Sequence, residues 1–167
     1  MIRLLSVFAL VLSLFVMSHA SVSQEAHDYR YAFYGFADYA VGVPNIPYPK
    51  MPKLKRGDQY FERRAAIKAS AAEPINFAGH LKVVAWGCGT QCQQGVIIDM
   101  LTGELHELPG SAAGYSYYID SALLVTNTYN DPNEEPPDWM KQRFYYWDGE
   151  QLVFIKEKKP PVADGGE

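Results

Sequence analysis

Between positions 81 and 156 the chain alternates short apolar, β-branched runs with breaks rich in glycine, asparagine and aspartate. Runs of this length and composition predict β-strands. The expected strands are 81–86, 95–99, 105–108, 115–118, 122–128, 143–147 and 151–156. The breaks between most of them are short, and short turns join antiparallel neighbours. The pattern therefore predicts a mainly antiparallel meander.

Upstream of these strands, residues 58–72 carry the period of an amphipathic helix. Phe61, Ala65 and Ile67–Lys68 stand near i, i+4 and i+7, and Asp58 is expected to cap the first turn. One helix followed by consecutive strands is typical of an α+β fold. We expect one N-terminal helix packed on a mainly antiparallel meander sheet of about six or seven strands.

The start of the chain has the pattern of a secretory signal. Arg3 is followed by an uncharged apolar run over 4–17, and small residues stand at the −3 and −1 positions before Ser21. The run is shorter than the roughly twenty residues of a membrane span. We expect residues 1–20 to be a signal peptide. The mature protein would be soluble, without a membrane span, and either periplasmic or secreted.

Three further regions follow the expected signal peptide. Residues 21–57 are expected to form an extended, aromatic and proline-rich arm, and the four prolines within 38–52 favour an extended chain. That proline-rich part is either a strap across the surface or a ligand for a partner domain. Residues 58–157 are expected to be the α+β domain, and 158–167 a disordered polar tail.

Charge and composition narrow the possible partners. The formal net charge is −4 and the basic residues do not cluster, which argues against nucleic acid and anionic membranes as partners. The 12 tyrosines, 8 phenylalanines and 3 tryptophans suit both β-sheets and binding surfaces, so they do not separate the two. The partner class left open is a protein or a small molecule.

The two cysteines, Cys88 and Cys92, are close in sequence, and in an exported protein they are expected to form a disulfide. A ring this small contributes only about 2 kcal/mol in the chain-entropy model. Its expected role is to hold the shape of one glycine-rich loop. The candidate binding residues of this loop are Gly87, Gly89, Thr90, Gln91, Gln93 and Gln94.

One part of the chain resembles the core of a family of exported bacterial proteins with no established activity. The resemblance rests on Asn76-Phe77-Ala78-Gly79-His80, Trp86-Gly87-Cys88-Gly89, Cys92, Asp99 and Thr102-Gly103. It extends upstream through the Arg63-Arg64 helix and the proline-rich segment. It implies a bacterial envelope or secreted location, and no chemistry.

Several chemical interpretations compete for the central stretch. Cys88 with His80 as base and Asp99 as orienting group is conceivable as a nucleophilic trio, but it needs a free thiol. A two-residue turn at Thr102-Gly103 would place His106 opposite Asp99 as an ion pair. His80 and His106 with the two cysteines are conceivable zinc ligands, although paired thiols argue against a metal.

The interpretation we prefer is a binding or inhibitor-like module that uses the disulfide-pinned loop and needs no cofactor. Preorganising a loop before association lowers the cost of ordering it on binding. The alternative is an envelope enzyme, either a hydrolase or a thiol-redox protein, centred on His80, Cys88 and Asp99. A binding role is preferred over catalysis because Cys92 competes for the Cys88 sulfur.

Overall fold

The structure is a computed structural model, and it describes residues 31–128 and 137–159. The chain divides into two compact units, Met1–Ala37 and Asp38–Glu167. The expected signal peptide lies outside the described residues, and so does all but the first two residues of the expected tail. Each unit is described by itself.

The described part of the first unit is aromatic and helical. Residues 31–34 are helical, and the 3-10 helix η1 (Phe36–Tyr39), whose first two residues belong to this unit, follows them. Within the unit the rings of Tyr31 and Tyr34 lie 5.7 and 6.0 Å from the ring of Phe36. The extended conformation expected for the arm is therefore wrong over these residues, because aromatic contacts favour a compact local turn.

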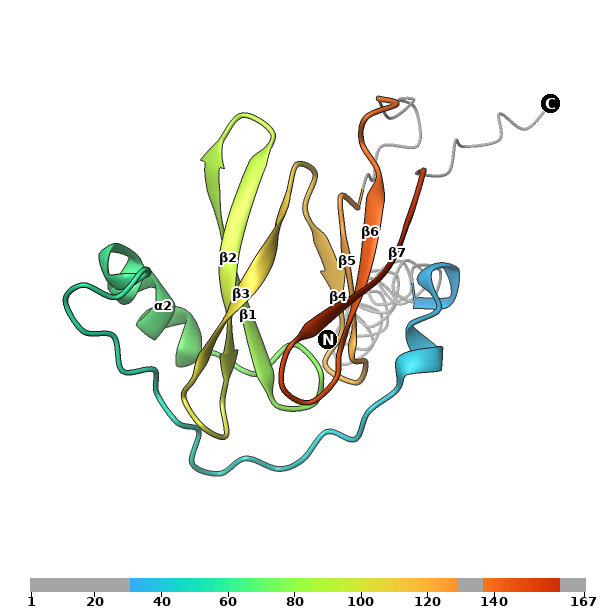
Figure 1. Cartoon of the computed structure of the whole chain (residues 1–167). Helices are drawn as coiled ribbons and strands as arrows, with labels where there is room; N and C mark the ends of the chain where they lie inside the picture. The colour runs from blue at the N-terminus through green and yellow to red at the C-terminus, as the bar shows by residue number, and fades with distance from the viewer. Residues whose placement is uncertain (1–30, 129–136, 160–167) are drawn as a thin grey trace, which may run out of the picture. The chain divides into compact units, whose positions relative to one another are not determined.

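Seven strands are present within the described residues, and all seven were expected. They are β1 (Leu81–Gly89), β2 (Cys92–Asp99), β3 (Leu105–Ser111), β4 (Tyr115–Tyr117), β5 (Leu123–Thr126), β6 (Gln142–Trp147) and β7 (Leu152–Lys158). Every pairing between neighbours is antiparallel. The strands form two sheets instead of the one expected, with orders β1-β2-β3 and β4-β5-β6-β7 (Figure 1).

The expected helix begins later and in a different way. The 3-10 helix η2 (Phe61–Arg63) leads into the α-helix α2 (Arg64–Ala71), and no side chain caps either start. The Asp58 carboxylate instead accepts a hydrogen bond from the Lys55 N–H at 2.6 Å. Asp58 therefore stabilises the turn before η2. The expectation that it would cap the helix is wrong.

Two clusters of buried side chains lie on the two faces of the β1-β2-β3 sheet. One cluster joins this sheet to α2, and its members are Ile67, Ala71, Val84, Val96, Ile98 and Met100. The other joins it to the second sheet and the connecting segments, through Phe77, Ala78, Leu81, Val83, Ile97, Leu108, Ala122, Leu124 and Trp147. Each fully buried large apolar side chain contributes roughly 1.5–3 kcal/mol. The first sheet is thus apolar on both faces.

The proline-rich segment runs past the ends of both sheets (Figure 1). The Val41 N–H donates to the Asp120 carbonyl at 2.9 Å, and the Lys50 N–H donates to the Met100 carbonyl at 2.8 Å. Ile46 packs against the cluster that contains α2. These contacts support the interpretation of residues 38–52 as a strap bound to its own domain.

A tight turn at residues 76–80 connects the strap, the first sheet and the second sheet. The Asn76 side chain accepts from the Val83 N–H at 2.8 Å and donates to its carbonyl at 3.3 Å, in the manner of a neighbouring strand. Gly79 has φ +77°, and its N–H donates to the Ile119 carbonyl at 2.6 Å. A Cβ atom on Gly79 would overlap the Gly42 carbonyl oxygen of the strap.

We predict that Gly79→Ala destabilises the fold more than Gly149→Ala does. Both positions have positive φ, 77° and 110°, so both substitutions carry backbone strain. A Cβ atom on Gly149 meets nothing within 4 Å, whereas one on Gly79 meets the strap. The additional loss at Gly79 should be about 1–3 kcal/mol, measured by urea denaturation. Equal losses of unfolding free energy in the two variants would show that the strap moves away from the new Cβ atom without loss of stability.

Candidate binding surface

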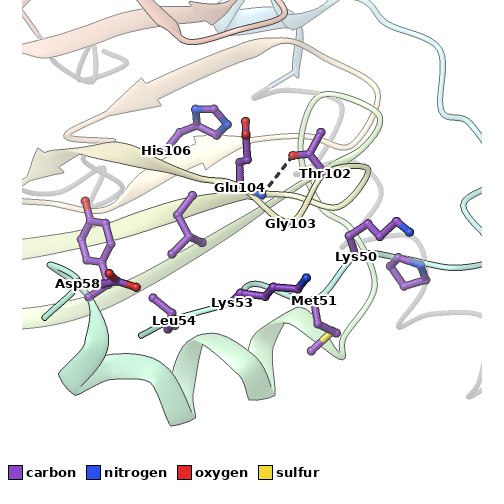
Figure 2. A pocket seen from close by; sticks show the side chains of 12 residues that line it. Lys50, Met51, Lys53, Leu54, Asp58, Thr102, Gly103, Glu104 and His106 are labelled. Carbon is purple, nitrogen blue, oxygen red and sulfur yellow. Dashed lines mark hydrogen bonds between the residues drawn. The ribbon is translucent and has the colours of Figure 1, made fainter. Parts of the chain in front are cut away.

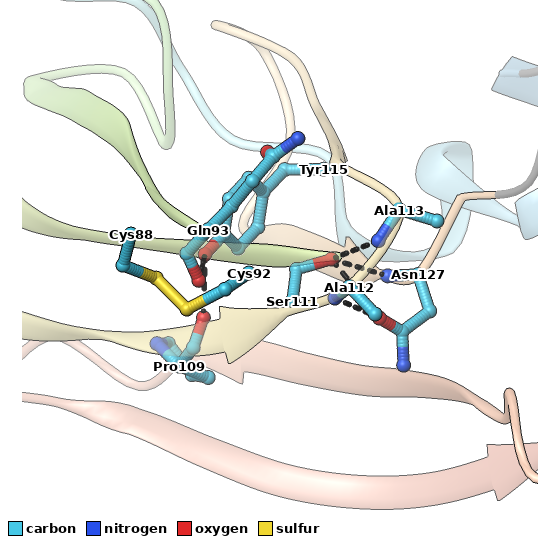
Figure 3. Close-up of a disulfide and its surroundings, with 9 residues drawn as sticks. All are labelled: Cys88, Cys92, Gln93, Pro109, Ser111, Ala112, Ala113, Tyr115 and Asn127. Atoms are coloured by element: carbon cyan, nitrogen blue, oxygen red, sulfur yellow. Dashed lines mark hydrogen bonds between the residues drawn. A yellow bond between two sulfur atoms is a disulfide. The ribbon is translucent and has the colours of Figure 1, made fainter. Parts of the chain in front are cut away.

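The hairpin between β1 and β2 ends in the disulfide expected from the sequence (Figure 3). Cys88 and Cys92 are bonded, with their Cα atoms 5.1 Å apart. Most of the candidate binding residues around them are exposed, and these are Gly87, Gly89, Thr90, Gln91 and Gln94. Gln93 is half-buried at the base. The disulfide therefore closes a tip that presents polar side chains to the solvent.

Backbone geometry shapes this tip together with the disulfide. Gly89 pairs with Cys92, and the register shifts between Gly87 and Gly89, so an irregularity of the β-bulge type precedes the turn. Gly89 has φ +143° and Gln91 has φ +52°. Gln91 therefore holds a left-handed conformation that is uncommon for a residue with a Cβ atom. The short disulfide ring restrains this turn.

The base of the hairpin is fixed by the Tyr115 hydroxyl (Figure 3). Its oxygen lies 2.9 Å from the Pro109 carbonyl and 3.1 Å from the Gln93 carbonyl, so it can donate to either. Burial, with a smaller contribution from Tyr117, raises the pKa of Tyr115 to about 12. A neutral phenol therefore joins the second sheet to the strand that carries the tip.

A second anchor, Asn127, was not identified from the sequence. Asn127 has φ +55°, and its side-chain oxygen accepts from the Ala112 N–H at 2.7 Å. The Asn127 N–H donates to the Ser111 hydroxyl at 2.9 Å, and this oxygen lies 2.6 Å from the Gly114 carbonyl. These bonds set the connection between β3 and β4. Asparagine tolerates the left-handed region, but no local motif marks this residue.

Aromatic and charged side chains gather beside the hairpin. Trp86 pairs with Gln94 in the strand register, one step before Gly87. The Arg63 guanidinium lies 5.6 Å from the centroid of the Trp86 ring, and the Tyr60 ring lies 6.3 Å away, edge to face. The buried Trp86 Nε1–H has no acceptor among the described residues. Tryptophan, tyrosine and arginine are the residue types most common in binding hot spots.

A cavity of about 980 Å³ lies between the strap and β3 (Figure 2). Lys50, Lys53, Asp58 and Glu104 contribute charges of both signs to its lining. His106 also lines it, with its ring 4.8 Å from the Trp147 ring, edge to face. The buried Nε2 of His106 has no partner in the described part of the chain.

The expected pair of Asp99 and His106 is wrong. His106 pairs with Ile97 in the sheet, and the Asp99 N–H donates to the Glu104 carbonyl at 3.0 Å. The turn is longer than the two residues assumed. The Asp99 carboxylate accepts from the Leu101 N–H at 2.7 Å, which holds this longer turn.

The structure does not bring Cys88 to His80 and Asp99. The Met100 N–H donates to the His80 carbonyl at 3.1 Å, so His80 and Asp99 lie at the same end of the sheet. Cys88 is seven residues beyond Leu81 on β1. At about 3.3 Å per residue, it lies roughly 23 Å along the strand from Leu81, which directly follows His80. The Cys88 sulfur is also bonded to Cys92.

The four residues that were considered as zinc ligands, and argued against, are separated in the same way. The two sulfurs form a disulfide at the hairpin tip, and His80 lies beyond the opposite end of β1. Among residues 31–128 and 137–159, no group of three or more histidine, cysteine, aspartate or glutamate side chains could hold a metal ion.

Comparisons with models of known families, with curated proteins and with solved structures found no match to the chain. Within the part of the chain that the structure describes, no helix has the length and apolar character to cross a membrane. Function must therefore be inferred from the geometry of the surface itself.

We predict that Tyr115→Phe reduces the alkaline loss of stability. The folded-state pKa of Tyr115, about 12, exceeds the unfolded value near 10. This stabilisation is therefore complete below pH 10 and is lost as the pH rises through 12. Denaturant unfolding at pH 8 to 12 should show a shallower fall for Tyr115→Phe than for the wild type. At pH 8 the variant should also be about 1 kcal/mol less stable, because it lacks a hydrogen bond.

Tyr48→Phe is the matched control, because the Tyr48 side chain is 85% exposed. It should reproduce the wild-type pH profile. If Tyr115→Phe does the same, the Tyr115 hydroxyl does not link the two sheets in solution.

Proposed function

We propose that the chain is an exported bacterial binding protein whose disulfide-pinned hairpin inserts into a concave site of a partner protein. The single observation that carries the proposal is the Cys88–Cys92 disulfide, which closes an exposed polar tip. In this proposal a single helix, α2, is laid on the strands and the whole forms a rigid frame. The mature protein is soluble and resides in the periplasm or is secreted.

The cost of association supports a role for the disulfide in binding. Ordering a mobile loop on binding costs free energy, and a loop ordered beforehand avoids most of it. The chain-entropy contribution of the small ring to global stability is only about 2 kcal/mol. Tyr115 and Asn127 fix the strands on which the tip is carried. Inhibitors of lysozymes and proteases use comparable preformed loops, which is an analogy of architecture only.

No observation favours the alternative of an envelope enzyme centred on His80, Cys88 and Asp99. Nucleophilic catalysis needs a Cys88 thiolate with a base within hydrogen-bond reach. The Cys88 sulfur is bonded, and His80 lies beyond the far end of the same strand. In a hydrolase that uses a different set of residues, the hairpin tip would not contact a partner protein. The first test below separates such a hydrolase from a protein that binds through the tip.

We predict that a photo-cross-linking residue at position 91 captures a specific protein in the cells that make this chain. A matched residue at position 150, in the exposed turn between β6 and β7, should not capture it. With the captured protein in hand, Gln91→Ala should weaken binding roughly tenfold, as expected for one contact residue of moderate importance. His80→Ala should leave the affinity unchanged.

Two outcomes would contradict the proposed binding role. Equal cross-linking from positions 91 and 150 would mean that the tip is not a binding site. An unchanged affinity for Gln91→Ala with a loss for His80→Ala would move the function to the other end of the sheet.

We also predict that the exported protein begins at Ser21 and carries no alkylatable thiol. Signal cleavage removes residues 1–20, and oxidation during export pairs the two cysteines. Intact mass before and after treatment with an alkylating reagent measures both features on one sample. Retention of residues 1–20 would indicate an uncleaved membrane anchor. Two alkylated thiols would remove the basis for a pinned tip.

A further inference from the structure

A small pocket lies on the first sheet beside the base of the pinned hairpin. Its floor includes buried Gly95 and Leu108, and its walls include the half-buried rings of Tyr60 and Trp86. The cavity measures about 280 Å³. Small-molecule sites usually measure about 300–1,000 Å³. This pocket is therefore of a size for one long side chain rather than for a cofactor.

Its charged groups are two carboxylates and one guanidinium. Glu62 and Glu107 both line the pocket and are both exposed. Glu62 comes from η2 and Glu107 from β3. Neither carboxylate has an ion-pair partner among residues 31–128 and 137–159. Tyr60 and Glu107 both line the pocket, and the pKa of Tyr60 is raised mainly by burial and to a smaller extent by the Glu107 charge. The pocket therefore has negative charge that the described residues do not neutralise.

Arg63 does not neutralise this charge fully. Its guanidinium lies 5.6 Å from the Trp86 ring centroid, which is within the range of a cation–π contact. With one arginine and two glutamates, the pocket has a net charge of −1. The larger cavity between the strap and β3 differs, because two lysines balance two carboxylates there.

We propose that this pocket binds one arginine or lysine side chain of the partner protein. The inference rests on the proposed binding function and names the partner's chemistry at this position. A single cation neutralises the net charge, its aliphatic stem packs against Tyr60, and its head lies between Glu62 and Glu107. Such an anchor between charged and aromatic groups gives specificity for a basic residue over an acidic one.

The proposal predicts a preference for basic residues in short peptides. The probes are labelled peptides of randomised sequence with arginine, lysine, alanine or glutamate fixed at the centre, and binding is followed by fluorescence anisotropy at low salt. Wild-type protein should bind arginine- and lysine-centred peptides roughly tenfold more tightly than alanine-centred ones, and glutamate-centred ones least. Glu107→Gln keeps the shape of the side chain and removes its charge. It should reduce this preference to below about twofold.

Glu104→Gln is the matched control, because Glu104 precedes the same strand but lines the other cavity. It should keep the full preference. Gln91→Ala should keep it too, since a short peptide in the pocket does not need the hairpin tip. A wild-type protein that keeps the peptide preference but gives no specific capture from position 91 would therefore contradict the proposed function alone.

Three results would overturn the pocket proposal. The first is equal binding of the four peptide classes by wild-type protein. The second is a full preference retained by Glu107→Gln, and the third is the same loss in Glu104→Gln as in Glu107→Gln. Thermal unfolding of each variant would verify folding, and these exposed substitutions should leave the midpoint unchanged within about 2 °C.

Discussion

The turn at residues 76–80 is the constraint on which the rest of the fold depends. It is bonded to two separate segments and closely approaches a third: Asn76 bonds to β1, Ala78 and Gly79 bond to the β4–β5 connection, and Gly79 lies so near the strap that a Cβ atom would overlap the Gly42 carbonyl oxygen. Phe77 is fully buried in the cluster between the sheets. The turn needs left-handed backbone at Ala78 and Gly79, with φ of 45° and 77°. A residue with a Cβ atom at Gly79 would disturb all of these contacts together. The same substitution in an exposed turn would disturb only the contacts within that turn.

The strained turn at one end of β1 and the closed tip at the other have different consequences. Around residues 76–80, strain is offset by burial and by bonds to several elements, so a change there affects global stability. Around Cys88 the surroundings are exposed, and the disulfide acts on a short ring. A change there alters the shape of the tip with little effect on the remainder of the fold. Binding residues on a rigid sheet are commonly placed in this way, since the scaffold tolerates their variation.

Strand positions could be predicted from the sequence because they depend on local pattern. Apolar alternation identified all seven strands, and the proximity of two cysteines identified the disulfide. The arrangement of two sheets could not be predicted, because the hydrogen bonds that join them link residues far apart in sequence. The Asn127 N–H donates to the Ser111 hydroxyl, 16 positions away, and the Tyr115 hydroxyl lies within hydrogen-bond distance of the Gln93 carbonyl, 22 positions away. The predicted pairing of His106 with Asp99 was wrong because the turn between β2 and β3 is longer than assumed. The Asp99 carboxylate accepts a hydrogen bond from the Leu101 N–H within this longer turn. The pocket beside Trp86 also escaped prediction, since its walls come from η2, β1, β2 and β3.

The hairpin tip and the pocket lined by Glu62 and Glu107 belong to one surface. Gly87 pairs with Gln93 and Trp86 pairs with Gln94, so the pocket begins one residue pair below the tip. At about 3.3 Å per residue, Trp86 and Cys88 are separated by only roughly 7 Å along β1. In the proposed binding mode, a partner that receives the tip in a concave site would place the rim of that site over the pocket. A basic residue on that rim would contact Glu107 without any movement of the strands, because β3 holds Glu107 in register with β2. The tip would then contribute shape complementarity, and the pocket would contribute selection by charge.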